Sequence, residues 1–369
     1  MRIGISCYST FGGSGVVATE VGKALAGRGH EVHILSPSLP PRLVGFEDRI
    51  NFHEVRASPY PLFEDAPYSI ALGSKMADVA EHHGLDILHA HYAIPHAMAA
   101  LLARMAVPHL KVVTTLHGTD ITVVGSDPSY LPMVRMAIRE SDGVTAVSDY
   151  LREETVRTFG VDRGIDVICN FVEPPGPERP NCRGWLAPKA AFVVTHISNF
   201  RPVKRVMDVL RVFERLRREL PVALVMVGDG PDRAEAEAYC RERGLGQEVR
   251  FTGKQLDIGT VLACSDLFLL PSATESFGLA ALEAMGHGVP VIASRVGGLP
   301  EVVRHGLDGY LEPMGDVDAM ARDALVLLKD EELRLAMGEA ARSRALGTFA
   351  EGPIVDQYED LYRRVLGQR

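Results

Sequence analysis

The sequence predicts an α/β protein made of two doubly wound domains, each built on a parallel sheet. Short apolar runs alternate with longer amphipathic stretches along the chain, a pattern typical of parallel strands covered by helices. A length of 369 residues exceeds the size at which one core keeps growing, so about two domains are expected. Four prolines between Val172 and Pro180 fit neither a helix interior nor a central strand, so they mark the boundary.

We therefore expect a first domain at residues 1–171, a proline-rich linker at 172–189 and a second domain at 190–352. A final helix at about 353–369 is expected to pack back on the first domain. The predicted strands of the first domain are Arg2–Ser6, His30–Leu35, Ile50–Val55, Ile87–His91, Lys111–Leu116, Gly143–Val147 and Asp166–Cys169. Those of the second are Phe192–Ile197, Ala223–Val227, Val249–Thr252, Leu267–Leu270, Pro290–Ala293 and Gly309–Leu311. Because open α/β sheets bind ligands at the strand carboxyl ends, we expect the two domains to face a cleft.

Composition argues against several classes of function. A net charge of -9 and a pI near 5.8 give no electrostatic footprint for nucleic acid. Five scattered cysteines without a C-x-x-C pair predict neither a disulfide framework nor a zinc site, and favour a reducing compartment. With no apolar run near the ~18 residues of a membrane span and no signal-peptide pattern, we expect a cytoplasmic protein. The sequence leaves open whether it forms a homo-oligomer.

The most informative motif is the segment Pro271–Glu283, which puts two carboxylates eight positions apart around a helix start. Leu267–Leu270 is predicted to be a buried strand, Glu275–Gly278 a turn and Leu279–Met285 the start of a helix. Turn amides and the helix dipole would face an anion. Glu275 and Glu283 could then accept hydrogen bonds from two different rings, a sugar and a ribose. The spacing alone also fits two solvated glutamates, so other segments must decide.

A glycine turn after the first strand gives a second anion signal. Gly12, Gly13 and Gly15 open a helix and would let the backbone approach a ligand closely. Their spacing matches neither the dinucleotide motif G-x-G-x-x-G nor a P-loop, so no nucleotide cofactor is predicted. A purely structural turn is the simpler alternative.

Histidines follow two strands of the first domain. His117 lies between a strand end and a glycine, where it could bond a sugar hydroxyl, support a leaving group, or be structural. His89 and His91 alternate on one strand, which superficially suggests a metal site. Without an acidic or cysteine partner at ligand spacing, we expect packing or substrate contact there and no metal.

The second domain opens with a strand and a basic loop that holds Arg201, Lys204 and Arg205. Fixed cations at that position would stabilise negative charge that grows on a departing phosphate. An exposed basic turn is the alternative. Gly228–Pro231, after the next strand, is predicted to be a tight turn without chemistry.

Together, these segments resemble the retaining GT-B glycosyltransferases of family four, and the resemblance covers almost the whole chain. It rests on the glycine loop, His117-Gly-Thr-Asp, Lys204, Gly228-Asp-Gly-Pro and the Glu275-x7-Glu283 pair. Longer stretches resemble the members that make N-acetylglucosaminyl malate in bacillithiol biosynthesis, namely Cys7–Glu20, Tyr60–Phe63, His91–His96, His117–Pro128 and Ile197–Arg205. The resemblance implies two Rossmann-like domains and transfer of N-acetylglucosamine from UDP-GlcNAc to the L-malate hydroxyl. The anomeric configuration would be retained, without a cofactor or a metal.

The resemblance also implies roles for individual residues. Glu283 would hold the uridine ribose, and Glu275 with the backbone of Phe277 and Gly278 would bind the sugar 3- and 4-hydroxyls. His117 would lie on the 6-hydroxyl side. The expected diphosphate contacts are Gly13, Ser14, Asn199 and Lys204, with Arg201 supplying the cation that many relatives carry at position 199. His117, Lys204 and Glu275 are the expected catalytic residues.

Malate is a small dianion, so its pocket should combine cations with hydroxyl groups. The acceptor candidates are Lys75, Tyr92, Thr119 and Arg135. Tyr92 and Thr119 adjoin the motifs above, whereas Lys75 and Arg135 rest on a looser analogy with a relative that uses an inositol phosphate. The family mechanism is a front-face substitution in which the protein supplies position and electrostatics.

Three other functions fit the same scaffold. A transferase with a lipid acceptor would need a basic amphipathic patch, which the first-domain helices lack. An epimerase would convert UDP-GlcNAc without an acceptor. A non-catalytic sensor would bind the UDP-sugar and release no UDP.

Overall fold

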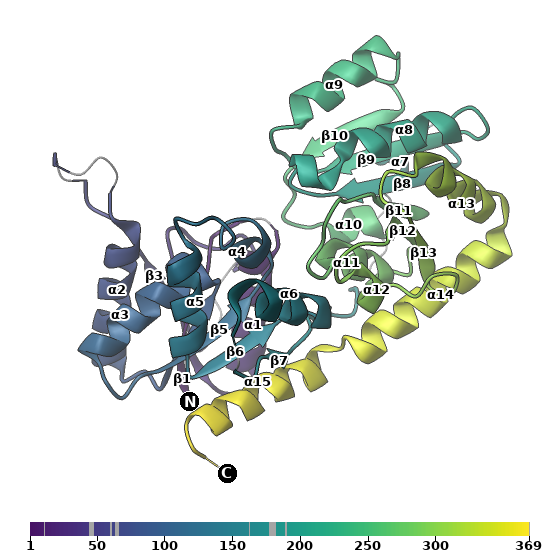
Figure 1. Cartoon of the computed structure of the whole chain (residues 1–369). Coiled ribbons are helices and arrows are strands. Elements are labelled where there is room, and N and C mark those ends of the chain that lie inside the picture. The colour runs from purple at the N-terminus through teal and green to yellow at the C-terminus, as the bar shows by residue number, and fades with distance from the viewer. Residues whose placement is uncertain are drawn as a thin grey trace. The chain divides into compact units, whose positions relative to one another are not determined.

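The computed structural model describes residues 1–10, 12–43, 48–59, 61–62, 66–161, 163–176, 182–188 and 190–368. The chain divides into two compact units, one of residues 1–170 with 351–369 and one of residues 171–350 (Figure 1). Part of the predicted linker (177–181 and 189) and Tyr60 and Phe63 of one motif lie outside the described residues. No helix among the described residues is both long enough and apolar enough to cross a membrane.

The first unit is built on a parallel sheet of seven strands in the order β3-β2-β1-β4-β5-β6-β7. Central β1 is buried on both faces, with Ile3 and Ile5 buried on one face and Gly4 and Ser6 on the other, as expected of a sheet covered by helices on both sides. The strands are β1 (Arg2–Ser6), β2 (Glu31–Ser36), β3 (Ile50–Glu54), β4 (Ile87–His91), β5 (Lys111–Leu116), β6 (Gly143–Ala146) and β7 (Asp166–Val167).

Helices follow most of these strands, and local signals set their ends. Ser148 caps one helix by accepting a hydrogen bond from the Leu151 amide at 3.1 Å, and left-handed Gly160 ends it. The helices are α1 (Ser14–Gly27), α2 (Tyr68–His83), the kinked turn η1 (Ala93–Ala97), α3 (Met98–Ala106), α4 (Thr119–Thr122), α5 (Leu131–Glu140), α6 (Asp149–Phe159) and α15 (Glu351–Val365).

The last helix, α15, belongs to the first unit although it comes after the second unit in the chain (Figure 1). Its Tyr362 hydroxyl lies 2.7 Å from Nδ1 of His89 on the central strand β4. Its carboxylates pair with the end of α1, since Arg28 lies 2.5 Å from Asp356 and 3.1 Å from Glu359. The helix therefore completes both the core and the surface of this unit.

The second unit contains a parallel sheet of six strands in the order β10-β9-β8-β11-β12-β13. Fully buried Val194, Phe213 and Leu224 lie in the core where α8 packs on the sheet. The strands are β8 (Phe192–Ile197), β9 (Val222–Val227), β10 (Val249–Gly253), β11 (Leu267–Leu270), β12 (Val291–Ser294) and β13 (Gly309–Glu312). The helices are α7 (Arg183–Leu186), the 3-10 turn η2 (Pro202–Lys204), α8 (Val206–Leu216), α9 (Arg233–Glu242), α10 (Gly259–Leu262), α11 (Leu279–Gly286), α12 (Leu299–Val302), α13 (Val317–Lys329) and α14 (Glu331–Thr348).

These two sheets confirm the predicted fold class, because every predicted strand occurs, with ends that shift by no more than two residues. The largest shift is at β7, which ends at Val167 where Cys169 was expected.

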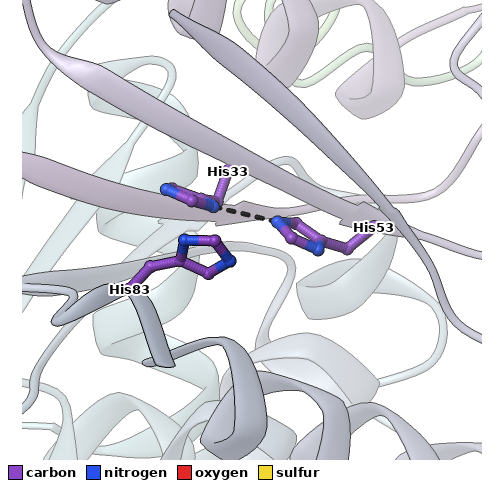
Figure 2. A group of neighbouring side chains, drawn as sticks. All are labelled: His33, His53 and His83. Carbon is purple, nitrogen blue, oxygen red and sulfur yellow. Dashed lines mark hydrogen bonds between the residues drawn. The ribbon is translucent and has the colours of Figure 1, made fainter. Parts of the chain in front are cut away.

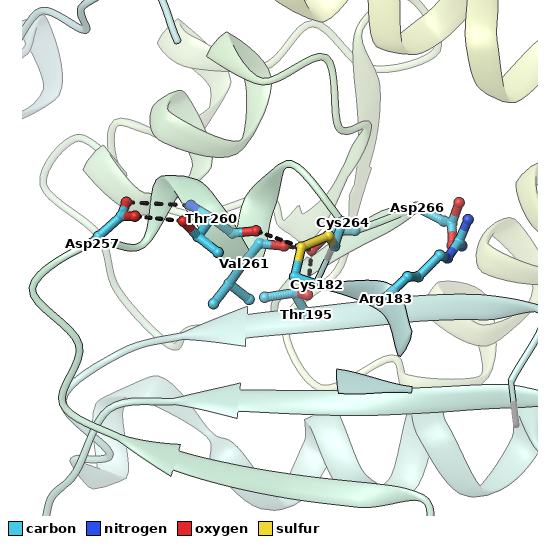
Figure 3. The surroundings of a disulfide bond; sticks show 9 residues. Cys182, Arg183, Thr195, Asp257, Thr260, Val261, Cys264 and Asp266 are labelled. Carbon is cyan, nitrogen blue, oxygen red and sulfur yellow. Dashed lines mark hydrogen bonds and ion pairs between the residues drawn. A yellow bond between two sulfur atoms is a disulfide. The ribbon is translucent and has the colours of Figure 1, made fainter. Parts of the chain in front are cut away.

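The expectation that the cysteines form no disulfide is wrong. Cys182 and Cys264 are joined in the second unit, with their Cα atoms 6.2 Å apart (Figure 3). The bond links the start of α7 to the turn between α10 and β11, and the neighbouring Arg183–Asp266 ion pair joins the same two segments. Local cysteine spacing gives no signal for this pair, since 82 residues separate its members and only the fold brings them together.

Candidate functional site

Most of the predicted site residues lie in loops that follow central strands of the two sheets. In each sheet the strand order reverses between two neighbours, β1 and β4 in the first unit and β8 and β11 in the second. Ligands of open α/β sheets bind beyond the carboxyl ends of such strands. The glycine turn follows β1, Tyr92 follows β4, Lys204 follows β8 and Glu275 follows β11. Each unit thus presents one group of candidate residues at the carboxyl edge of its own sheet.

In the second unit, the structure brings Lys204 and Glu275 together. The Lys204 ammonium lies 2.5 Å from Oε1 of Glu275, and the Ser272 hydroxyl donates to the same oxygen at 2.8 Å. The side chains are 20% and 12% exposed, so the pair remains accessible from one side. The loops themselves are joined by the Ala273 amide, which donates to the Val203 carbonyl at 2.7 Å. Sequence reasoning had missed Ser272.

Glycines hold the backbone of both loops in place. A Cβ on Gly297, where φ is 55°, would lie 1.8 Å from the Glu275 carbonyl oxygen, and the Gly298 amide donates to that oxygen at 2.9 Å. A Cβ on Gly228 would lie 1.8 Å from the backbone carbonyl oxygen of Ser198, and one on Gly230 would lie 2.0 Å from that of Asn199. The Gly228–Pro231 turn therefore supports the loop that carries Asn199, and no side chain could replace hydrogen at these positions without moving it.

A buried histidine, His196, lies beneath these loops and was missed from the sequence. Its Nδ1 is 2.9 Å from the Leu269 carbonyl and its Nε2 is 2.8 Å from the Ser198 hydroxyl. Burial lowers the pKa of His196 to about 4, and the Lys204 charge adds to that effect. The ring is therefore neutral at pH 7, donates from Nδ1 to the carbonyl and accepts at Nε2 from Ser198. It fixes the ends of β8 and β11 relative to each other.

Gly278 is the residue before helix α11 and has a φ of 102°. A Cβ at Gly278 would lie 2.5 Å from the Leu299 side chain. No side chain caps the helix, so its first amides are available to an anion. The Phe277 ring is 2% exposed and packs on Phe349, which leaves only its backbone for ligand contact. Glu283 lies on the same helix and is 9% exposed.

The other residues of this loop differ in their contacts. Asn199 and Arg201 are exposed. Arg205 lies 2.5 Å from Asp208, whose side chain is 3% exposed. Contact of Arg205 with a diphosphate stays a prediction.

In the first unit, His117 lies in a group of aromatic side chains at the ends of β4 and β5. Its Nε2 is 2.9 Å from Nδ1 of His91, and its ring stacks on Tyr92 at a centroid distance of 5.7 Å. Burial lowers the pKa of His117 to about 3, with the neighbouring His89 and His96 adding to the effect. His117 can thus offer hydrogen bonds to a ligand but no positive charge at neutral pH.

Asp120, the acidic residue of the His117-Gly-Thr-Asp motif, fixes the His117 turn. Its fully buried carboxylate accepts from the amides of His117 at 3.1 Å, Gly118 at 2.8 Å and Ala93 at 3.2 Å. Burial raises its pKa to about 6, against the opposing effect of these amides. Asp120 joins the loops that follow β4 and β5. The feature of the sequence that marked Asp120 is its position in the His-Gly-Thr-Asp motif directly after a strand.

The other histidines near β4 are buried. His89 bonds Tyr362 and the Thr115 hydroxyl, both at 2.7 Å, so both ring nitrogens are occupied within the core. His96 bonds the Ser6 hydroxyl at 2.6 Å through Nδ1. Its Nε2 and that of His91 have no hydrogen-bond partner among the described residues. Buried nitrogens of this kind could accept or donate to a bound molecule.

Three of the four acceptor candidates lie near the His117 group, and the fourth does not. Tyr92 adjoins His117, and Thr119 is the first residue of α4 after it. Arg135 lies on α5, which packs on η1, and its buried Nε lacks a hydrogen-bond partner within the described part of the chain. Lys75 is not joined to this group: its ammonium pairs with Asp78 at 3.1 Å, and its charge acts on His53 of β3.

At the glycine turn, Gly13 precedes α1 with a φ of 58°, and Ser14 begins the helix and is 7% exposed. A Cβ on Gly13 would meet nothing within 4 Å, whereas one on Gly15 would lie 2.3 Å from the Tyr8 carbonyl oxygen. The first turn of α1 holds no acidic residue and no side-chain cap. Its amides therefore favour an anionic ligand beside Gly13.

Comparison with known proteins identifies the family. Residues 11–174 match the family model described as Glycosyltransferase Family 4, and residues 181–344 match that of Glycosyl transferases group 1. The N-acetyl-alpha-D-glucosaminyl L-malate synthase of Bacillus anthracis is 47% identical over 99% of this chain and 97% of its own. The chain belongs to glycosyltransferase family 4. This family-4 glycosyltransferase is also 29% identical, over 97% of the chain and 80% of the relative, to the D-inositol 3-phosphate glycosyltransferase of Mycobacterium tuberculosis.

Solved structures identify the architecture of this glycosyltransferase as GT-B. Anabaena Alr3699/HepE in complex with UDP-glucose matches with a TM-score of 0.82 at 21% identity, over 98% of each chain. A sucrose-phosphate synthase from Thermosynechococcus elongatus matches with a TM-score of 0.81 at 22% identity, over 100% of this chain and 99% of that one. At these identities the likeness establishes the fold.

Proposed function

We propose that this glycosyltransferase transfers N-acetylglucosamine from UDP-GlcNAc to the hydroxyl of L-malate and retains the α configuration. The observation that carries the proposal is the 47% identity to the Bacillus anthracis N-acetyl-alpha-D-glucosaminyl L-malate synthase, which extends over 99% of the chain and so includes both groups of candidate residues. A cytoplasmic location stays a prediction from the sequence, and the oligomeric state stays open.

The donor is assigned to the second unit. Lys204 and Ser272 hold Oε1 of Glu275, so the other carboxylate oxygen can accept hydrogen bonds from sugar hydroxyls. The uncapped start of α11 at Gly278 offers amides on the same side, and Glu283 would bind the ribose. Lys204 and exposed Arg201 would offset the charge on the departing phosphate, with Asn199 beside them. We expect no metal ion to be needed for this step.

In the reaction, the bond from the anomeric carbon to the phosphate oxygen breaks and a bond to the malate hydroxyl oxygen forms. The hydroxyl proton moves to the departing diphosphate, which leaves as UDP. None of this requires a covalent link to the protein, whose contribution is position and fixed charge.

The acceptor is assigned to the first unit, where the charge argument favours Arg135. L-malate carries two negative charges, yet the pKa of His96 and that of His117 are lowered to about 3 by burial, so neither ring is cationic at pH 7. Arg135 has a buried Nε without a hydrogen-bond partner among the described residues. A malate carboxylate would supply that partner, while Tyr92 and Thr119 could orient the malate hydroxyl.

The test is UDP release from UDP-GlcNAc with and without L-malate, combined with the mass and anomeric coupling of the product. The proposal predicts malate-dependent release and an α-linked glucosaminyl malate. Release without malate would indicate an epimerase or hydrolase. Release only with an inositol phosphate or a lipid would move the function to another acceptor, and binding without release would indicate a sensor.

A further inference from the structure

Three histidines that lie far apart in the sequence come together at one edge of the first unit. His33 is on β2, His53 is on the edge strand β3 and His83 is in the last turn of α2. Each contributes a ring nitrogen that lies within 4.8 Å of the nitrogens of the other two. Figure 2 shows the three rings turned toward one another between the strands and the helix end.

The register of the sheet explains why the first two rings meet. Strands β2 and β3 are parallel, with Asn51 opposite His33 and His53 opposite Leu35. Because alternate residues of a strand share a face, His33 and His53 are diagonal neighbours on the same side of the sheet. The end of α2 brings His83 to that side, with its ring centroid 4.4 Å from that of His33 and 5.6 Å from that of His53.

A carboxylate orients the central imidazole of the group. Nε2 of His33 lies 3.2 Å from Oε1 of Glu31, and Nδ1 lies 2.9 Å from Nε2 of His53. An imidazole that donates from Nε2 to a carboxylate presents a lone pair at Nδ1, which here faces the other two rings. Carboxylates fix the tautomer of metal-binding histidines in this way.

The cations nearest to the three rings are already paired. Arg2 lies 3.6 Å from Glu31, and Lys75 lies 3.1 Å from Asp78. Imidazole nitrogens are among the ligands that zinc prefers in proteins.

We propose that His33, His53 and His83 bind one zinc ion, with water as the fourth ligand. Zinc–nitrogen distances of about 2.0–2.1 Å in a tetrahedron put ligand nitrogens ~3.4 Å apart. From separations of at most 4.8 Å, side-chain rotations of His53 and His83 at the surface suffice to close the group. His53 would then bind through Nε2 and carry its proton on Nδ1.

This site is separate from the residues proposed for transfer. Helix α2 ends at His83, just before β4 begins at Ile87, so its last turn lies at the amino edge of the sheet. The glycine turn and His117 lie at the carboxyl edge. The zinc ion would join the edge strand β3 to α2 and stabilise this part of the unit, without a role in the chemistry.

The experiment measures zinc retained by untagged full-length protein after exposure to ZnCl₂ and dialysis, using elemental mass spectrometry. The expected result is one zinc per chain, and an affinity in chelator competition that falls by at least ~100-fold in the His53→Gln/His83→Gln double variant. The matched control is His82→Gln, since His82 is exposed and adjacent to His83 but outside the group. This control should bind zinc as the wild type does.

Two further measurements separate a metal site from a purely structural cluster. Glu31→Gln keeps all three ligands and should lower the affinity about 10- to 100-fold. Cobalt(II) in the wild type should give the intense visible absorption of a four-coordinate site, and the double variant should lack it while keeping its far-UV circular dichroism. Substoichiometric zinc in the wild type, or equal affinity in the wild type and the folded double variant, would overturn the proposal.

Discussion

Lys204 and Glu275 form an ion pair of 2.5 Å although 71 residues separate them in the chain. The pairing is a direct result of topology, because β8 and β11 are neighbours in the sheet and each residue lies in the loop that follows its strand. The same relationship makes the pair sensitive to the shape of both loops.

Replacement of Glu275 by glutamine should lower kcat by about 10²–10³-fold, the usual effect of removing a preorganised polar group from a transfer site. Lys204→Ala should have a similar effect. The free energy of unfolding should fall by no more than ~3 kcal/mol in either variant, because both side chains keep some solvent contact. Steady-state UDP release and urea unfolding measure the two effects. Glu219→Gln, which breaks an exposed pair with Lys329, is the control and should leave turnover unchanged. Near-normal kcat in Glu275→Gln would contradict the assignment.

A methyl group at Gly297 should damage the site through the backbone of Glu275, because its Cβ would lie 1.8 Å from that carbonyl oxygen. A displacement of about 1 Å can cost ~10²-fold in rate, so we expect a fall of that order in kcat/KM for UDP-GlcNAc. Gly306→Ala is the matched control, since Gly306 also has a positive φ, 78°, but open space at its Cβ. Both variants should lose ~1–3 kcal/mol of stability from backbone strain, and only Gly297→Ala should lose activity. Equal kinetics in the two variants would show that the clash is harmless.

Arg135→Gln should raise the KM for L-malate by about 10–100-fold, the effect of one lost hydrogen bond to a charged group. The KM for UDP-GlcNAc should not change. Arg139→Gln, an exposed position on the same helix, serves as control. If both substrates are affected alike in Arg135→Gln, the residue supports the fold and does not select the acceptor.

The buried histidines predict that the protein loses stability in mild acid. Burial lowers the pKa of His89, His96 and His117 to about 3 from the ordinary 6.5. The unfolded chain thus binds protons that the folded chain cannot. The contribution of these three histidines to the free energy of unfolding is therefore complete above pH 6.5 and is lost as the pH falls toward 3. Asp120 acts in the opposite sense, because its pKa is raised to about 6 and its effect weakens the fold as the pH rises from 3.8 to 6.

The measurement is the free energy of urea unfolding between pH 5 and 7. Each histidine adds up to ~1.4 kcal/mol per pH unit to the slope, so His96→Gln should lower the slope by about that amount. His109→Gln changes an exposed ring and should leave the slope as it is. An unchanged slope in His96→Gln would mean that this ring is protonated in the folded protein.

The positions of the strands could be predicted from the sequence because apolar runs such as Leu267–Leu270 are buried on both faces of parallel sheets. The pairing of Lys204 with Glu275 was within reach for the same reason, since both motifs directly follow such strands. The pattern did not show which nearby cations form local ion pairs. Arg205 is paired with Asp208 only one helical turn away, and Lys75 is paired with Asp78.

Side-chain groups formed by residues far apart in the chain could not be predicted from the local spacing of residues. Cys182 meets Cys264, and His33 meets His53 and His83, only once the strands and helices are in place. Asp120 could be seen as polar and placed after a strand, but its bond to the Ala93 amide depends on η1, which the sequence does not signal.

The place of α15 has a consequence for synthesis on the ribosome. The residues of the first sheet emerge before the second unit begins, yet Tyr362, the partner of His89 on the central strand, is translated after the whole of the second unit. The core of the first unit therefore cannot be finished until the second unit has been made. A nascent chain halted after residue 350 would expose the face of the sheet that α15 covers, so the N-terminal half of this enzyme is the last to mature.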